Sequence, residues 1–410
     1  MSQIKLTHGA AISGEPLTTS TTNKLAPGLL LNEIDRRVTM IRPTATPIDQ
    51  ISRCGGCRQS GSMIVEYYSV SSKPDTARVT SFNAATKMGD VQTYTLSVDS
   101  DIFQESETIL CLPPSASSAA DSLVLYVMSR DESTGNLTVV ALASADMEPE
   151  DMNINTGDTL VRMGRAATEL DVQTPQFEAL PTKDDNYCQI FKMQIEESTY
   201  QKIANKEVGW TFSDQEEIAI MDMRLGMEKN FLFGVKNRFT NPRKHEEVLT
   251  TGGIYMQAAK DFSLSKATLS ESVLIDMLRS AFTGTGGGAT RKILVGGSEL
   301  ISALSKIATT HVVMGAQTFT RWGIDFNEIT SKFGTLLVKY NEVFDICGHA
   351  SDGLVFDPQY LTKYAHVPFK AERLDLRTSG QRNTNAVVAT EASCLVLRCP
   401  DAHMRVHLTA

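Results

Sequence analysis

The sequence has no long hydrophobic run. Its longest strongly apolar stretch is Leu123–Met128, whereas a helix needs roughly 20 apolar residues to cross a bilayer. The first 30 residues also contain no apolar run, so we expect no signal peptide and synthesis in the cytoplasm. These absences argue against an integral membrane protein, and we expect no membrane partner.

Cysteine and positive charge are also scarce. The 7 cysteines are an odd number scattered over 410 residues, which is not the pattern of a disulfide framework. The chain has 39 Lys and Arg against 48 Asp and Glu, so its formal net charge is −9. The basic surface by which many nucleic-acid-binding proteins are recognised is therefore absent.

The remaining composition is typical of a soluble globular protein. Hydrophobic residues make up 41% of the chain and charged residues 21%, with 27 Gly and 14 Pro. These proportions exclude collagen-like, coiled-coil and largely disordered chains. The length suggests roughly two or three domains.

The negative charge is concentrated in one segment. Residues 131–185 hold 12 acidic and 3 basic side chains, and the rest of the chain holds 36 of each sign. A solvated surface explains such a segment, and a surface that binds a basic partner is the alternative.

The N-terminal hundred residues contain two unusual segments. Residues 1–30 hold eight Ser and Thr and little charge, and they predict an extended arm that becomes ordered on a partner surface. Strand patterns at 63–70 and 92–98 predict a long two-stranded excursion. Because an isolated hairpin is marginal in water, we expect it to rest on another surface.

A small all-β module is predicted next. Four short runs rich in branched residues are separated by turn signals such as Pro113-Pro114. The runs overlap the acidic segment, so we interpret residues 106–185 as an inserted acidic β domain. The four predicted strands are Thr108–Leu112, Leu123–Met128, Leu137–Leu142 and Thr159–Met163.

The second half predicts an α+β fold. Ser213–Glu216 fits a capping box, and two apolar seams follow it as far as Phe239. A helix over 214–239 would be about 39 Å long. Alternating helices and strands continue to residue 408, including a short helix opened by Asp357-Pro358.

No motif in the sequence predicts a catalytic site or a metal site. Cys54 and Cys57 form a CxxC pair, but a zinc ribbon needs a second pair of similar spacing. The nearest candidate, Cys394 and Cys399, has four residues between its cysteines. His403 and His407 fall on a strand pattern, where residues four apart lie about 13 Å apart. The glycines at 284–288 precede a strand, which is the wrong polarity for a phosphate loop. We predict no catalytic residue, no metal and no cofactor; a redox or metal enzyme using Cys54 and Cys57 remains a minor alternative.

The order of parts resembles a family of viral shell proteins. Four sequence segments resemble major capsid proteins of tailed bacteriophages, which have the Hong Kong 97 fold. The segments are residues 42–51, 66–70, 226–234 and 249–254. The resemblance covers most of residues 40–400. It implies an icosahedral head shell that encloses double-stranded DNA and is built from hexamers and pentamers. It also implies that the protein is not an enzyme. A cargo-holding encapsulin-like shell is the alternative within this fold.

The resemblance also implies a domain plan. It predicts an N-terminal arm (1–50), an extended loop with the start of the peripheral domain (51–105) and the inserted β domain (106–185). The peripheral domain with its spine helix (186–265), the axial domain (266–370) and return strands to the peripheral domain (371–410) follow. The implied assembly contacts are Tyr67, Tyr68, Lys73, Arg78 and Lys87.

The resemblance implies partners as well. They are further copies of the chain, portal and scaffolding proteins, decoration proteins, and packaged DNA bound without sequence specificity. Assembly is expected in the host cytoplasm, and the product is a virion shell. Lys73 and Lys87 lie in the loop region where some members crosslink Lys to Asn, but no Asn and Glu partners are identified here.

Overall fold

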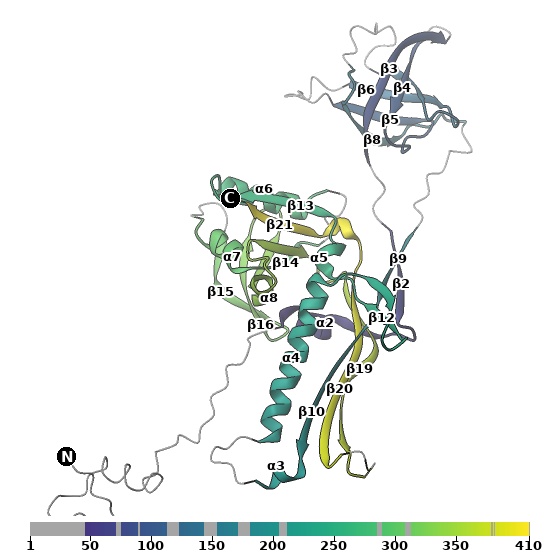
Figure 1. The fold of residues 1–410 in the computed structure, drawn as a ribbon. Coiled ribbons are helices and arrows are strands. Elements are labelled where there is room, and N and C mark those ends of the chain that lie inside the picture. Colours follow the sequence, from purple (N-terminus) through teal and green to yellow (C-terminus); the bar gives the residue numbers. More distant parts are fainter. Residues whose placement is uncertain are drawn as a thin grey trace, which may run out of the picture. The chain divides into compact units, whose positions relative to one another are not determined.

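The computed structural model describes most of the chain from residue 46 onward (Figure 1). The described ranges are 46–70, 75–88, 91–112, 123–142, 154–170, 181–204, 211–284, 289–307, 313–378, 380 and 382–409. The arm predicted over 1–50 lies outside them except for its last five residues. The chain divides into two compact units, one with residues 1–45, 192–224 and 369–390, and one with 46–191, 225–368 and 391–410.

A seven-stranded mixed sheet organises much of the larger unit. Its order is β13-β21-β18-β14-β17-β16-β15. β14 pairs in parallel with β17 and β13 with β21, and the other pairs are antiparallel. The strands are β13 (Lys260–Ser265), β14 (Arg291–Gly296), β15 (Val313–Arg321), β16 (Ile324–Thr330), β17 (Thr335–Tyr340), β18 (Asp352–Phe356) and β21 (Met404–Thr409).

Two helices bury their apolar sides against this sheet. α6 (Glu271–Phe282) and α7 (Ser298–Ser305) contribute leucines and a methionine that share one core cluster with Leu294, Val355 and Val406. The helical spacing of these leucines explains why they face the strands. Shorter helices α5 (Ile254–Gln257), α8 (Glu342–Ile346) and the 3-10 turn Pro400–Ala402 connect the strands.

A second, four-stranded sheet has the order β1-β19-β20-β10. β1 (Cys57–Gln59) is parallel to β19 (Leu361–Asp375), and β20 (Thr384–Leu397) and β10 (Gln189–Ser198) follow. α2 (Pro47–Gly56) leads directly into β1. The smaller unit contains α3 (Thr199–Ile203) and the first half of α4 (Phe212–Phe233).

Six strands close into a barrel, β3-β4-β7-β6-β5-β8. They are β3 (Thr76–Met88), β4 (Val91–Val98), β5 (Glu107–Leu112), β6 (Leu123–Arg130), β7 (Leu137–Ala141) and β8 (Thr159–Arg165). Inward residues from all six strands, among them Val79, Leu96, Leu125 and Leu160, form one buried cluster. The barrel therefore has its own core and no free strand edge.

The barrel corrects two sequence predictions. The boundary at residue 106 divides it, because β3 and β4 are barrel strands and not an exposed excursion. The pairing of Thr76 with Val161 closes the barrel, and such long-range pairing leaves no local sequence signal. Residues 182–185 lie outside the barrel, since β9 (Thr182–Tyr187) pairs with β2 (Ile64–Ser69) instead.

The C-terminal boundary also differs. The predicted division at residue 370 falls inside β19, which begins at Leu361. The last strand, β21, pairs with β13 and β18 in the seven-stranded sheet and does not return to the four-stranded one. Asp357-Pro358 opens a turn rather than a helix, in which the Asp357 carboxylate accepts a hydrogen bond from the Gln359 amide (2.9 Å).

The long helix is shorter than predicted and begins with a different cap. α4 has 22 residues and is about 33 Å long. Thr211 and Asp214 form the reciprocal cap, through the Thr211 amide to Asp214 Oδ2 (2.8 Å) and the Asp214 amide to Thr211 Oγ1 (3.3 Å). Ser213 therefore lies inside the helix. After Gly234 the chain turns into a hairpin of β11 (Asn237–Thr240) and β12 (Glu247–Thr250).

Gly253, beside the end of α4, provides a test of this packing. A Cβ at Gly253 would lie 2.7 Å from the Phe233 amide and closer still to the Leu232 carbonyl. We expect Gly253→Ala to lower the free energy of unfolding by about 1–3 kcal/mol. Gly226→Ala, within α4 and with no atom near the added methyl, is the control and should stabilise by about 0.5–1 kcal/mol. Urea denaturation of the subunit measures both, and equal effects would contradict the packing.

Candidate functional site

The five predicted assembly residues occupy different environments. Tyr67 and Tyr68 are neighbours on β2 and point to opposite faces. Tyr67 is 5% exposed, and its hydroxyl donates to Asp184 Oδ2 (2.9 Å). Burial and, after it, the neighbouring Asp184 carboxylate raise the pKa of Tyr67. Tyr68 is 57% exposed. The subunit therefore uses Tyr67 internally and leaves Tyr68 available for a contact.

Arg78 lies on the outside of the barrel, in β3. Its side chain is exposed, and its backbone amide donates to Asp99 Oδ1 (2.8 Å). Lys87 is also in β3, where it is in register with Gln92. Lys73 lies outside the described residues. Tyr68 and Arg78 are thus separated, one on the β2–β9 ladder and the other on the barrel.

Other large apolar side chains are exposed in both units. In the smaller unit, α3 exposes Tyr200 and Ile203. In the larger unit the exposed set includes Val70, Leu142, Met163, Ile190, Val235 and Met256. Single exposed apolar residues are ordinary, but Tyr68 on β2 and Val70, just beyond the end of β2, are exposed two residues apart, where a neighbour could cover both.

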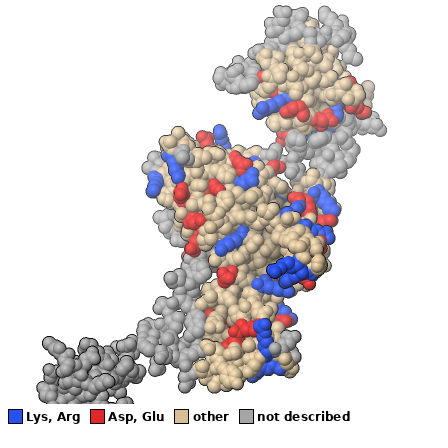
Figure 2. Space-filling model, viewed as in Figure 1, with Lys and Arg blue, Asp and Glu red and all other residues tan. Residues whose placement is uncertain are grey.

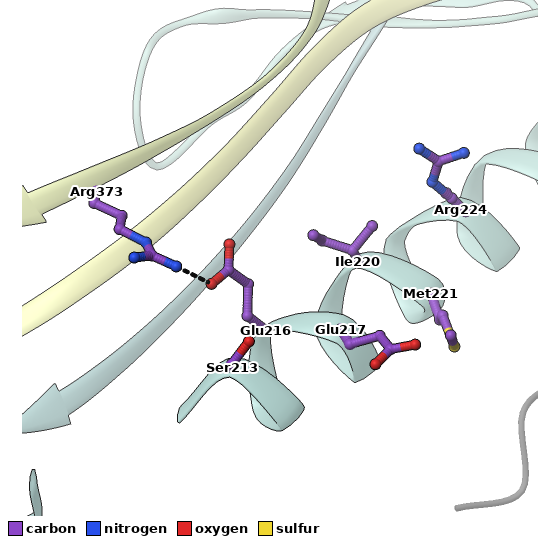
Figure 3. Close-up of a pocket in the computed structure, with 7 residues that line it drawn as sticks. All are labelled: Ser213, Glu216, Glu217, Ile220, Met221, Arg224 and Arg373. Atoms are coloured by element: carbon purple, nitrogen blue, oxygen red, sulfur yellow. Dashed lines mark hydrogen bonds and ion pairs between the residues drawn. The ribbon is translucent and has the colours of Figure 1, made fainter. Parts of the chain in front are cut away.

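A hollow of about 450 Å³ lies along the first turns of α4 in the smaller unit. Arg373 reaches toward Glu216 and pairs with it at 3.0 Å (Figure 3). Arg224 lies 5.3 Å from the centre of the Phe369 ring. The residues that line the hollow carry charges of both signs beside the apolar Ile220 and Met221. Such a mixed lining is more typical of a protein–protein contact than of a catalytic site.

The sequence predictions missed a buried ionic cluster in the larger unit. Lys363, which is 2% exposed, contacts Asp49 Oδ1 (2.8 Å) and Glu391 Oε1 (2.7 Å). The second Asp49 oxygen pairs with Arg53 Nε (3.0 Å). Two carboxylates and two cations therefore cancel, as burial of charge requires. Lys363 Nζ also lies 5.2 Å from the centre of the Phe231 ring.

Glu228 extends this cluster through backbone contacts. Its side chain is fully buried, and it accepts hydrogen bonds from the Ile48 and Asp49 amides (2.9 and 2.8 Å) at the start of α2. Asn341 Nδ2 donates to the same carboxylate at 2.9 Å. A carboxylate at a helix N-terminus satisfies orphan amides and complements the helix dipole. Glu228 therefore joins α4 to α2.

The cluster did leave a signal in the sequence. Lys363 alternates with Leu361 and Ala365 on the buried face of β19, and Glu228 follows Met227 within the apolar seam of α4. A charged residue at an apolar position is a sign of buried pairing. Their partners, Asp49 and Glu391, could not be identified without knowledge of the fold.

The other cysteines and histidines are dispersed. Cys54 is in the last turn of α2 and Cys57 begins β1, so the CxxC pair lies at a helix end, and both residues are exposed. His403 precedes β21 and His407 lies within it. In the described ranges, no three His, Cys, Asp or Glu side chains are grouped to hold a metal ion.

Surface charge is mixed on the face shown in Figure 2, where Lys and Arg lie among Asp and Glu. Among the residues that the structure describes, no helix has the length and apolar character needed to span a membrane. The described side chains thus present contact surfaces and a buried ionic cluster, without a constellation suited to catalysis.

The chain belongs to the SU10 major capsid protein family, whose model matches residues 15–410. It is therefore a capsid protein that forms the shell of a virion, and it is not an enzyme. The family sets aside the redox or metal enzyme at Cys54 and Cys57.

Solved structures similar to this chain come from a GTA particle and from phages. The capsid of an empty GTA particle is 7% identical, with 96% of this chain and 100% of that chain covered and a TM-score of 0.46. The structure from Gordonia phage Cozz is 11% identical, with 99% of this chain and 99% of that chain covered and a TM-score of 0.47. The structure from Mycobacterium phage Bobi is 9% identical, with 97% of this chain and 100% of that chain covered and a TM-score of 0.48. No curated protein matches the chain.

Removing the buried ammonium should destabilise the subunit. In Lys363→Met, Asp49 and Glu391 would remain buried without their shared cation, which should cost about 3–5 kcal/mol of unfolding free energy. Lys370→Met, on the same strand, removes an exposed pair with Glu372 and should cost less than about 1 kcal/mol. Urea unfolding measures both variants. Similar small losses in the two would show that the cluster contributes little.

Glu228 predicts a dependence of stability on pH. Burial raises its pKa from 4.5 to about 7, so the folded protein holds this proton more tightly than the unfolded chain. The charged form therefore carries a cost that is absent below about pH 4.5 and grows as the pH rises to about 7, reaching about 3 kcal/mol.

Unfolding measurements between pH 5 and 8 test this dependence. Glu228→Gln, which cannot ionise, should lose less stability than the natural chain as the pH rises. The slope with pH is the readout, because the amide also changes the hydrogen bonds to α2. Identical slopes would rule out titration of Glu228.

Proposed function

We propose that this chain builds the icosahedral head shell of a tailed bacteriophage, that it encloses double-stranded DNA, and that the shell assembles in the host cytoplasm. Membership of a capsid protein family supports the shell. The observation that carries the proposal is the β2–β9 ladder, on which Tyr68 is exposed while its neighbour Tyr67 is buried; Val70, just after the end of β2, is exposed as well. Such a surface gains most when a neighbouring subunit covers it.

The parts correspond to a Hong Kong 97 plan in our proposal. α4 is the spine helix, and the four-stranded sheet belongs to the peripheral domain. The seven-stranded sheet, with α6 and α7, is the axial domain. The β2–β9 ladder is the base of the extended loop, and the barrel of residues 76–165 is inserted into that loop.

Repetition explains how modest contacts suffice. A closed shell presents the same surfaces at every lattice position, so each subunit engages several neighbours at once. Once the first contact forms, the others become intramolecular, and their combined strength exceeds that of any single one. Residues 1–50, Tyr68, Arg78, Lys73 and Lys87 are the proposed contact elements.

The remaining partners follow from the shell. We propose portal and scaffolding proteins, decoration proteins at the outer surface, and DNA bound without sequence specificity. The acidic segment 131–185 includes exposed Asp131 and Glu132 in the β6–β7 turn. Packaged DNA would repel this charge at every lattice position, so the barrel faces outward. A capsid map with the barrel on the inner wall would contradict this.

Expression of the whole chain alone, followed by negative-stain electron microscopy, tests the proposal. The natural chain should form closed shells, tubes or capsomers. Tyr68→Ala should give a folded subunit with a yield of assembled particles reduced by roughly tenfold, because the same weakened interface recurs at every lattice position and multivalency amplifies the effect.

Tyr67→Phe is the matched control on the other face of the same strand. It removes only the hydroxyl bond to Asp184, so it should lower stability by about 1 kcal/mol and leave assembly unchanged. Assembly of Tyr68→Ala at the natural level would contradict the proposed contact. A small fixed oligomer of the natural chain would contradict the shell, whereas shells that hold protein cargo in place of DNA would favour the encapsulin-like alternative.

A further inference from the structure

Two buried thiols meet at the base of the β2–β9 ladder. Cys188 links β9 to β10, and its amide donates to the Met63 carbonyl (2.7 Å) beside β2. Cys394 lies in β20. Their Sγ atoms are 3.6 Å apart, although the residues are 206 positions apart in the chain. Both side chains are 0% exposed and share a cluster with Val65, Tyr67 and Val396.

The two thiols are not equivalent. The hydrogen bond between the two Sγ atoms lowers the pKa of Cys188 and so favours its thiolate. The same bond, together with burial, raises the pKa of Cys394. Cys188 is therefore the more nucleophilic member, and Cys394 lies within reach to complete the reaction.

We propose that Cys188 and Cys394 form an intrachain disulfide after the shell leaves the host cytoplasm. The inference rests on the proposed cytoplasmic assembly, because the cytoplasm keeps thiols reduced and the surroundings of a released virion do not. The oxidant is a small peroxide. With both sulfurs inaccessible to solvent, only an oxidant close to the size of water reaches them during local opening.

The reaction takes two steps. The Cys188 thiolate attacks one oxygen of hydrogen peroxide, the O–O bond breaks, and hydroxide leaves and takes up a proton to become water. Cys188 is then a sulfenic acid. Cys394 sulfur attacks Cys188 sulfur, its proton joins the departing hydroxyl as a second water, and the S–S bond forms. The two sulfurs lose two electrons, which reduce the peroxide.

The bond would join the base of the ladder to β20. It would close a loop that contains α4 and most of the seven-stranded sheet, and a crosslink across so long a loop restricts the unfolded chain strongly. The barrel enters and leaves through β2 and β9, so the bond would also fix the base from which it projects.

Determining the oxidation state of Cys188 and Cys394 in the natural chain by alkylation and mass spectrometry tests the inference. Cells that express the chain are lysed directly in denaturant with N-ethylmaleimide, while purified shells are first exposed to hydrogen peroxide. Peptide mass spectrometry should find both cysteines alkylated in the cell sample and a peptide pair, lighter by two hydrogens, linked through Cys188 and Cys394 in the oxidised shells.

Two outcomes would overturn the inference. Alkylated Cys188 and Cys394 in oxidised shells would show that the pair stays reduced, and the linked pair in the cell sample would show that it closes before release. Microscopy of the same samples scores assembly separately. Failure of the disulfide in well-formed shells therefore leaves the proposed function standing, and the unassembled subunit can be oxidised and mapped if no shells form.

Variants provide the functional readout. Oxidised natural shells should melt several degrees higher than the same shells treated with dithiothreitol, and Cys394→Ser shells should show no such difference. Cys54→Ser is the control, because Cys54 is exposed, and it should keep the full difference. The mass measurement on the natural chain decides the question even if Cys394→Ser fails to fold.

Discussion

The buried ammonium of Lys363 is the constraint on which the larger unit depends. It cannot be buried alone, so Asp49 must come from α2 and Glu391 from β20 to meet it. Glu228 places the same helix through its amides. Elements far apart in the chain therefore have to arrive together. α2 has ten residues and buries Ile48 and Ile51 beside Asp49, so apolar contacts and charge compensation together position it.

Through Asp49 and its backbone amides, α2 is connected to Lys363 and Glu228, and through Glu228 to Asn341. Gln50 adds a bond from its side-chain amide to the Trp322 carbonyl (2.8 Å), in the two-residue turn between β15 and β16. Trp322 and Gly323 both have positive φ there, as a tight hairpin turn requires. One short helix thus contacts elements of both large sheets.

Local patterns predicted local structure well, and non-local structure poorly. The alternation in β4 and the run of branched residues in β6 are visible in a short window, so these elements were predicted near their observed positions. The pairing of Thr76 with Val161 and of β21 with β13 depends on residues far apart in sequence, so neither the closed barrel nor the strand partners of β21 were predicted. The cap at Thr211 was missed because Ser213–Glu216 matches the same pattern two residues later. The family was predicted from sequence segments that contain no catalytic residues. The buried partners of Lys363 could be identified only once the fold was known.

The ladder that carries the barrel has a consequence for how such shells diversify. Ser69 and Thr182 are directly opposite each other at its far end, so the chain leaves and re-enters at nearly one point. A closed barrel with its own core, attached through adjacent ends, can be lost, gained or exchanged without redesign of the body beneath it. In the proposed shell, with the barrel facing outward, the sequence of the barrel can therefore change without matching changes in the rest of the subunit.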